Sequence, residues 1–302
     1  MNDNLPLVSI VVASYNNGQY LEECLESAVN QTYQNIEIII ADDCSTDNSI
    51  EVCQKIIEKY PSKKIILVSN SQNMGACNSL NNVILNYSRG DWIKFLDSDD
   101  YLYANAVSDL VNNILLANTD ISCAYGITDV LYRNNITRTF GSAYDFRRII
   151  SGVNMIPTCA SMIKTEDFKK ICGFPTDGYV GDFYLWLALS LQEKNFLFVN
   201  AIISVYRRNS SPNSMMQNRF SMIMSQAEIF LSLGRKFKKY QYECIETAEK
   251  FLNAKHYLRL LEVTHDSVTK GLVYYILHIV KLFKYSSKMT ILFVPRLLFK
   301  ML

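Results

Sequence analysis

The first hundred residues repeat one pattern, a short apolar run followed by a segment with helical hydrophobic spacing. Four of these runs have the length and the valine and isoleucine content of strands: Val8–Ser14, Ile36–Ala41, Lys64–Val68 and Trp92–Leu96. Runs without polar alternation are typical of strands buried on both faces, and repeated strand–helix units favour right-handed crossovers between parallel strands. The sequence therefore predicts an α/β fold, with a doubly wound, mainly parallel sheet. Beyond Ile121–Val130 the alternation weakens.

The segments between these runs predict the covering helices. After the turn at Tyr15–Gly18, apolar residues recur at helical spacing up to Val29. Ser45 or Thr46 is expected to cap the next helix, and a third is expected to begin near Gly75.

Composition narrows the class of protein. The chain has 302 residues, of which 49% are apolar, so it can bury a large core, and its length suits a catalytic domain with an appendage. The formal net charge is only +1. We expect no basic run with interleaved aromatic residues of the kind that tracks a nucleic-acid backbone, and hence no nucleic-acid partner.

The cysteine and histidine pattern argues against a zinc site. The chain has eight cysteines and three histidines, and no cysteine pair has Cys-x-x-Cys spacing. The first residues are polar and lead directly into a strand, without an apolar signal region. A reducing cytoplasm is the expected compartment.

Two acidic clusters each follow directly on a predicted strand. They are Asp42-Asp43 and Asp97-Ser98-Asp99-Asp100. The carboxyl ends of neighbouring parallel strands share one edge of a sheet, so the two clusters are expected to meet around one ligand. Carboxylates repel one another by about 1 kcal/mol per close pair even in a wet environment, and an Asp-x-Asp arrangement of hard oxygen ligands suits Mg²⁺ or Mn²⁺. For Asp42 and Asp43, helix capping is an open alternative.

Several segments together resemble one enzyme family. In chain order they are Val8–Asn16, Tyr20-Leu21, Asn30–Tyr33, Glu37–Ala41, Asp42–Asp47, Asn73–Gly75 and Gly90–Asp100. This ordered set, which with the downstream motifs extends over about 210 residues, is similar to the family 2 glycosyltransferases with the A-type fold. The resemblance implies an inverting enzyme that moves a sugar from a nucleoside diphosphate donor to an acceptor hydroxyl.

The resemblance assigns the residues around the base. Ala13, Ser14 and Tyr15 would form the wall around the nucleobase, with Tyr15 lying against the ring. Asp43, and with it Asp42, would accept a hydrogen bond from the base. Because a carboxylate cannot donate, this contact suits the N–H of uracil, and UDP is the favoured nucleotide.

It also assigns the metal and diphosphate contacts. Asp99 would be the main ligand of Mn²⁺ or Mg²⁺, which bridges to the diphosphate, and Asp97 would lie near the ribose or the metal waters. Ser98, Asn73 and Gly75 are counted with the donor-binding residues. The metal would offset the charge on the departing UDP.

The acceptor side is expected downstream, in Cys172–Pro175 and Val180–Trp186. Family members usually have Gly-Gly-Phe and then Glu-Asp near a helix start. Asp182 matches that Asp and is the candidate catalytic base, which an inverting displacement needs to take the proton from the attacking hydroxyl. The open alternative is that Asp182 caps the helix that follows. Gly181 replaces the usual Glu.

Three other positions depart from the family pattern. Leu80 stands where Arg is common, Val83 where Gly is frequent, and Asn209 where the Tyr-Arg-x-His loop has His. Arg207 and Arg208 in the same loop are candidates to neutralise the diphosphate, with a solvated surface loop as the alternative.

The C-terminal part has a different character, and we expect a catalytic domain at residues 1–215 and a helical region at 216–302. Lys270–Leu302 contains six Lys or Arg and no Asp or Glu. Its polar residues recur at helical spacing, which predicts an amphipathic helix in a membrane interface, with packing on the catalytic domain or a second subunit as the alternative. The expected location is thus the cytoplasmic face of the inner membrane. The oligomeric state is open.

The leading hypothesis is transfer of a single sugar to a glycan or lipid-linked acceptor in synthesis of a surface polysaccharide, lipopolysaccharide or capsule. Single transfer is favoured because neither Trp92 nor Trp186 follows an Arg, as the motif of processive synthases requires. One alternative is a catalytically degenerate nucleotide-sugar-binding or assembly protein. Another is a sugar-phosphate nucleotidyltransferase, but the first turn lacks the Gly-rich phosphate loop.

Overall fold

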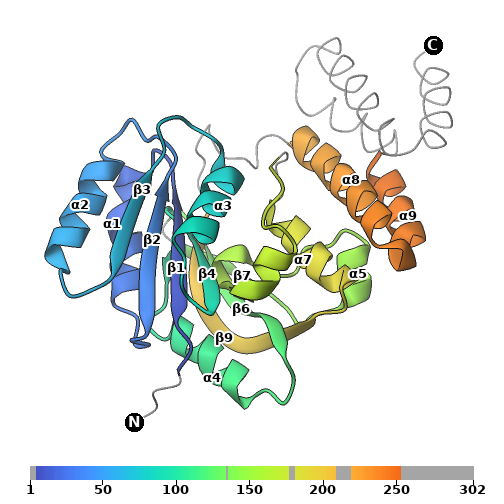
Figure 1. Ribbon diagram of the computed structural model, residues 1–302, viewed down its shortest axis with the longest axis horizontal. Helices are drawn as coiled ribbons and strands as arrows, with labels where there is room; N and C mark the ends of the chain where they lie inside the picture. Colours follow the sequence, from blue (N-terminus) through green and yellow to red (C-terminus); the bar gives the residue numbers. More distant parts are fainter. Residues whose placement is uncertain (1–4, 134, 177–180, 209–218, 253–302) are drawn as a thin grey trace. The chain divides into compact units, whose positions relative to one another are not determined.

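The computed structural model describes residues 5–133, 135–176, 181–208 and 219–252 (Figure 1). The chain divides into two compact units. The first comprises Met1–Ile149, Asn154–Thr176 and Tyr184–Ser210, and the second Ile150–Val153, Asp177–Phe183 and Ser211–Leu302. The domain boundary expected at residue 215 falls outside the described residues.

One sheet organises the first unit. In the described residues it has nine strands in the order β3-β2-β1-β4-β8-β6-β9-β5, with β7 paired to β6. The strands are β1 (Val8–Ser14), β2 (Ile36–Asp42), β3 (Ile65–Ser69), β4 (Trp92–Asp97), β5 (Tyr101–Leu102), β6 (Ile121–Tyr132), β7 (Asn135–Phe140), β8 (Ser161–Lys164) and β9 (Asn195–Arg207). The first four are parallel neighbours, as the sequence predicts. Beyond them β8 runs antiparallel to both β4 and β6.

Helices cover both faces of the sheet. Figure 1 shows α1 (Gly18–Val29) and α2 (Ser49–Lys59) together on one side of the first strands and α3 (Ala76–Asn86) on the other. Further helices of this unit are α4 (Ala106–Leu116), α5 (Phe146–Ile150), the 3₁₀ turn η1 (Thr158–Ala160), α6 (Thr165–Lys170) and α7 (Gly181–Leu191), of which α5 and α7 each extend into the second unit.

The strands β1, β2 and β4 are buried on both faces, which explains their largely unbroken apolar sequences. On one face, Ile10 and Val12 pack in a core that α1, α2 and α4 complete. On the other, the ring of Phe95 packs against Phe174 and Trp186, with centroids 5.5 and 6.4 Å apart. Alternate residues of these central strands thus supply two separate cores.

One prediction about helix starts is wrong. The helix α2 begins at Ser49, with Asn48 in the N-cap position, so neither Ser45 nor Thr46 caps it. Their side chains instead bond to Asp42 and Asn16. The prediction for α3 is confirmed, because Gly75 immediately precedes its first residue.

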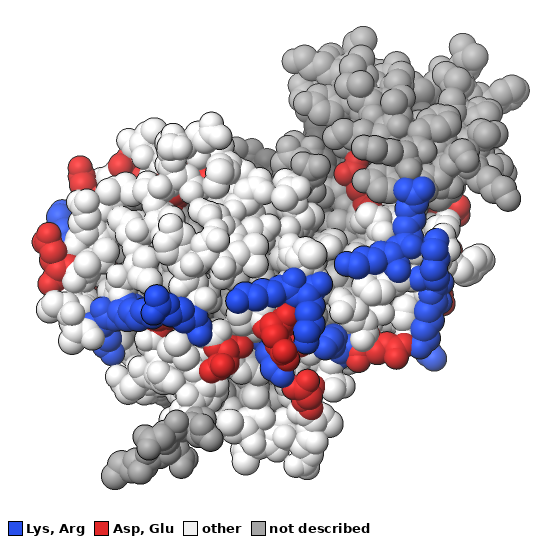
Figure 2. Space-filling view, in the orientation of Figure 1, with Lys and Arg blue, Asp and Glu red and all other residues white. Residues whose placement is uncertain are grey.

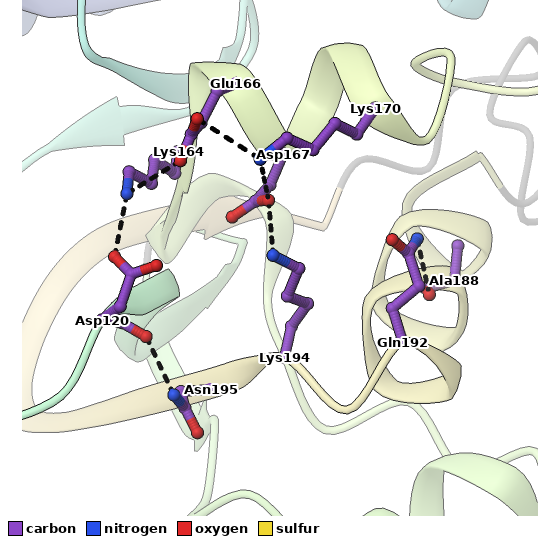
Figure 3. A network of polar contacts seen from close by, with 9 residues as sticks. All are labelled: Asp120, Lys164, Glu166, Asp167, Lys170, Ala188, Gln192, Lys194 and Asn195. Carbon is purple, nitrogen blue, oxygen red and sulfur yellow. Dashed lines mark hydrogen bonds and ion pairs between the residues drawn. The ribbon is translucent and has the colours of Figure 1, made fainter.

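Ion pairs join the residues just before β6 and β9 to the carboxyl end of β8 and to α6 (Figure 3). Lys164 pairs with Asp120 at 2.8 Å and with Glu166 at 2.9 Å. Asp167, which is buried, pairs with Lys194 at 2.8 Å. These contacts lie at the edge of the sheet opposite to the two acidic clusters.

The described part of the second unit is mainly a pair of helices, α8 (Arg219–Lys236) and α9 (Gln241–Leu252), joined by the 3₁₀ turn η3 (Lys238–Tyr240). Within the described ranges, no helix combines the length and apolar character needed to span a bilayer. The predicted interfacial helix at Lys270–Leu302 lies outside the described residues.

Candidate functional site

The two acidic clusters lie at one edge of the sheet, on either side of β1. In the strand register, Ser14 of β1 faces Asp42 and Ala13 faces Asp97. The ladder continues past the strand ends. The amide of Asp43 donates to the carbonyl of Ser14 at 2.9 Å, and that of Ser98 donates to Ala13 at 3.0 Å. The sheet alone therefore brings these predicted residues together.

The turn after β1 links both clusters. Asn16 accepts a 2.7 Å hydrogen bond from the amide of Thr46, and its own amide donates to Oγ of Ser45 at 3.0 Å. Asn17 donates from Nδ2 to Oγ of Ser98 at 2.9 Å. Asn16 has a φ of 51°, a conformation that Asn tolerates better than most residues. No role was predicted for either Asn, although an Asn-Asn-Gly turn is a visible sequence signal.

This turn leaves one aromatic ring open to solvent. Tyr15 is 44% exposed at the edge of the sheet. A ring held beside the carboxyl ends of the strands is available to stack on a planar base.

Asp43 is the anchor of the loop between β3 and α3. It is buried and accepts hydrogen bonds from the amides of Met74 at 2.8 Å and Gly75 at 2.7 Å. The side chains of Asn70 and Ser79 donate to it at 3.0 and 2.8 Å. Burial alone would raise the pKa of this carboxyl, but these four donors lower it below its ordinary value. The carboxylate thus holds the loop that contains Asn73 and Gly75.

Asp42 has a similar framework role. It is fully buried and accepts from the amide and the hydroxyl of Ser45, at 3.1 and 2.5 Å, and from the hydroxyl of Ser69 at 3.1 Å. Sequence reasoning did not identify Asn70, Ser69 or Ser79 as partners, because they are separated from the Asp pair by 27 residues or more.

The second cluster presents its carboxylates unequally. Asp97 is exposed and Asp99 half-buried, whereas Asp100 is buried. Burial raises the pKa of Asp100 well above its ordinary value, and the charges of Asp97 and Asp99 raise it further. Burial and the same three carboxylates raise the pKa of Tyr206 to about 12. This end of β4 is therefore a site of concentrated negative charge.

That charge and the donor set fit a hard divalent cation. Asp97 and Asp99 offer accessible carboxylate oxygens, the ligand type that Mg²⁺ and Mn²⁺ prefer. Among the described residues, no group of three or more His, Cys, Asp or Glu side chains is arranged to hold a metal. Two carboxylates suffice for Mg²⁺, which commonly takes its remaining ligands from water and substrate phosphates.

Arg207 reaches the cluster through its backbone. Its amide donates to Oδ1 of Asp100 at 2.8 Å. Its guanidinium lies over the rings of Tyr20 and Tyr101, at 5.2 and 5.1 Å from the centroids, and pairs with Glu23. The side chain is only 14% exposed. Arg207 is therefore packed beside the site and already partnered.

Two other predicted residues have simpler surroundings. Arg208 is exposed, and its guanidinium lies 6.0 Å from the ring centroid of Tyr132. Asp182 is half-buried and is the second residue of α7, inside the first turn of the helix. It is therefore not the N-cap itself, and its carboxylate is well placed for the helix dipole.

Two departures from the family pattern are core residues. Leu80 and Val83 of α3 are both buried. Asn209 lies outside the described residues.

Comparison with known proteins decides the class. The model of the family described as Glycosyl transferase family 2 matches residues 9–171, which is more than half of the chain. The chain belongs to glycosyltransferase family 2. It is therefore an enzyme of the glycosyltransferase type, and the nucleotidyltransferase alternative has no support.

Two curated relatives match most of the chain. One is the UDP-Glc:alpha-D-GlcNAc-diphosphoundecaprenol beta-1,3-glucosyltransferase WfaP of Escherichia coli, 30% identical over 77% of this chain and 88% of its own length. The enzyme WfgD of the same species, whose name states the same reaction, is 30% identical over 74% of this chain and 85% of its own length.

Solved structures support the A-type fold. The S. aureus TarS 1–349 complex with UDP-GlcNAc superposes with a TM-score of 0.69 at 16% identity, over 94% of this chain and 82% of that one. The mannosyltransferase PcManGT of Pyrobaculum calidifontis, solved with GDP-Man and Mn²⁺, superposes with a TM-score of 0.59 at 16% identity, over 95% and 83% of the two chains.

Proposed function

We propose that this glycosyltransferase moves a single sugar, with inversion, from a UDP-sugar to a hydroxyl of a lipid-linked acceptor in surface polysaccharide synthesis. The observation that carries the proposal is the meeting of Tyr15, the Asp42-Asp43 pair and the exposed Asp97 at one edge of the sheet. The acceptor class is supported by WfaP and WfgD, whose names specify a GlcNAc-diphosphoundecaprenol acceptor and UDP-Glc.

The donor would lie along this edge. Tyr15 would stack on the uracil, and Asp43 would accept its N–H while it holds the loop at Asn73–Gly75 in place. Asp97 and Asp99 would hold Mn²⁺ or Mg²⁺. When bound, that ion neutralises the charge that develops on the leaving diphosphate.

The acceptor would be activated by Asp182. This carboxylate would take the proton of the acceptor hydroxyl as its oxygen bonds to the anomeric carbon and UDP departs from the opposite face. Attachment to the cytoplasmic face of the inner membrane, through the basic region Lys270–Leu302, would bring the enzyme to such an acceptor.

Nucleotide titration tests the donor site first. We expect the purified protein to bind UDP more tightly than GDP, ADP or CDP, and to do so with Mn²⁺ but not with a chelator. Binding of no nucleoside diphosphate under either condition would favour the degenerate-scaffold alternative.

Two variants then separate the roles of the carboxylates, with UDP-Glc as the first donor to test. Asp99→Ala is expected to reduce metal-dependent turnover on the order of 10²–10³-fold, since it removes charge stabilisation of the leaving group. Asp182→Asn is expected to reduce transfer by roughly 10²–10⁴-fold, the usual contribution of a general base, with UDP affinity nearly unchanged. The control Asp120→Ala removes an exposed carboxylate at the opposite edge of the sheet. Equal loss of UDP affinity in Asp99→Ala and Asp182→Asn would contradict this division of roles.

A further inference from the structure

A basic turn connects the two described helices of the second unit. Between Glu228 and Glu243 the chain has four cationic residues and no acidic one, and all four cations fall within five residues. We call Arg235, Lys236, Lys238 and Lys239 the basic turn. Three aromatic residues, Phe237, Tyr240 and Tyr242, lie among and just after these cations.

All four cations of the basic turn are exposed. Figure 2 shows basic side chains gathered over the α8–α9 part of the visible face. Tyr242 is 77% exposed, the ammonium of Lys239 lies 5.2 Å from the ring centroid of Tyr240, and that of Lys236 lies 5.7 Å from Phe237. Two of the cations therefore lie beside half-buried aromatic rings, and Tyr242, three residues past the last cation, is open to solvent.

Close packing and backbone hydrogen bonds hold the backbone of the basic turn in place. Gly234 approaches Cys244 so closely that a Cβ at Gly234 would come within 2.8 Å of the Cys244 Cβ. The amide of Phe237 donates to the carbonyl of Leu233 at 2.8 Å, and that of Tyr240 donates to Phe237 at 3.0 Å. These contacts fix the backbone that presents the cations.

Helix stabilisation explains only half of the basic turn. Arg235 and Lys236 occupy the last turn of α8, where cations interact favourably with the helix dipole. Lys238 and Lys239 lie beyond that helix, in η3. These two lysines and the exposed Tyr242 lie outside the last turn of α8, so the dipole of that helix does not explain their presence.

We propose that the basic turn binds anionic phospholipid headgroups at the membrane surface. This inference rests on the proposed function, because a diphosphate lipid acceptor is confined to a bilayer. The surface has the chemistry that a bilayer interface selects: cations on flexible stems for the phosphates, and tyrosines for the boundary between headgroups and acyl chains. A nucleic-acid groove instead needs cations spaced along a strand, whereas these four are confined to one turn.

The expected size of the effect follows from the number of cations. Each Lys or Arg close to an anionic membrane strengthens binding roughly fivefold. Four cations in contact with the membrane would strengthen binding roughly several hundred-fold. This gain in affinity should diminish as salt screens the charges.

The test is sedimentation of the full chain with phosphatidylcholine vesicles that contain either no anionic lipid or about 30 mol% phosphatidylglycerol. The basic-turn variant, which has serine at all four cationic positions, is expected to bind the anionic vesicles at least about 30-fold more weakly than the wild type. The matched control replaces Lys55, Arg89, Arg138 and Arg147, four exposed cations of the first unit, by serine. It changes net charge equally and should weaken binding less than about threefold.

Two results would overturn the proposal: wild-type binding by the basic-turn variant, or equal weakening in the control. Retention on a single-stranded oligonucleotide with the same dependence on the basic turn would also overturn it, in favour of a nucleic-acid partner. If the variant with four serine substitutions does not fold, the double variant Lys238→Glu/Lys239→Glu tests vesicle binding by the same surface at two exposed positions.

The failure of this inference can be told apart from that of the proposed function. The basic-turn variant should keep wild-type UDP affinity and wild-type transfer to a short-chain, water-soluble acceptor. Loss of vesicle binding in the variant, with no transfer by the wild type to any acceptor, would support the basic turn and refute the proposed function.

Discussion

Lys94→Met is expected to change how stability depends on pH. Lys94 lies on β4, three residues before the acidic cluster, and is fully buried. Its ammonium group donates to the carbonyls of Phe95 at 2.7 Å and Cys159 at 2.6 Å. Burial lowers the pKa of Lys94 from 10.5 to about 8, although the nearby Cys159, Asp97 and Asp100 act in the opposite direction.

The sign follows from proton binding in the two states. Between the folded pKa of about 8 and the unfolded value of 10.5, the unfolded chain keeps the proton that the folded protein has lost. The free energy of unfolding therefore rises with pH across this window. At 1.36 kcal/mol per pKa unit, the gain between roughly pH 7 and pH 10 is about 2.5 kcal/mol. A neutral amine has two N–H donors, so it can still bond to both carbonyls.

Urea unfolding of the wild type and of Lys94→Met at several pH values measures this gain. The stability of the wild type relative to the variant should rise by about 2.5 kcal/mol, because only the wild type contains the titrating group. Lys55→Met, at an exposed position on α2, is the control and should leave the pH profile parallel to that of the wild type. The reasoning would be refuted if the free energies of unfolding of the wild type and of Lys94→Met differed by the same amount, within about 0.5 kcal/mol, at every pH.

Two further substitutions test the framework of the site and the opposite edge of the sheet. Asp43→Asn turns one acceptor oxygen into a donor, so it should reduce the free energy of unfolding by about 1.5–3 kcal/mol and weaken UDP binding. An unchanged free energy of unfolding in urea would contradict the anchoring role of Asp43. Lys194→Met removes the closest cation from Asp167, whose pKa is held below its ordinary 3.8 because the ion pair outweighs the effect of burial. Stability from this pairing is present above about pH 3.8 and is lost as pH falls, so the variant should lose about 2–3 kcal/mol at neutral pH and less in acid. Circular dichroism during urea unfolding at several pH values measures it, and equal loss at all pH values would count against the pairing.

The first half of the fold was predictable because three of its four main strands, β1, β2 and β4, are buried on both faces. Continuous apolar runs such as Val8–Ser14 mark such strands without reference to the rest of the chain. The order of strands after β4 was not predictable in this way. The strand β9 pairs with both β6 and β5, and β8 is antiparallel to its two neighbours, so these positions depend on contacts far apart in sequence.

The same distinction applies to the site. The two acidic clusters were predictable because each begins at the carboxyl end of a strand of a parallel sheet. The start of α2 was not, because the side chain of Thr46 bonds to Asn16, 30 residues away, and that of Ser45 to Asp42. The partners of Asp43 were equally hidden, since Ser79 is 36 residues away. Local sequence gives Ser and Asn several possible partners, and tertiary structure selects one.

Arg207 has a structural role in the described contacts, and the donor-binding role predicted for it would have to be compatible with them. The hydrogen bond to Oδ1 of Asp100 is donated by the backbone amide of Arg207, so it does not depend on where the Arg207 side chain lies. The guanidinium is held by Glu23, which is 59% exposed, and by two tyrosine rings. Because Glu23 is exposed, its ion pair contributes at most about 1 kcal/mol, whereas each cation–π contact of the largely buried guanidinium contributes up to about 2 kcal/mol. A diphosphate carries more charge than one carboxylate and accepts bidentate hydrogen bonds from Arg. The predicted donor-binding role would therefore require the guanidinium to exchange Glu23 for the diphosphate and keep its tyrosine contacts, while the backbone contact keeps β9 in register with the acidic cluster.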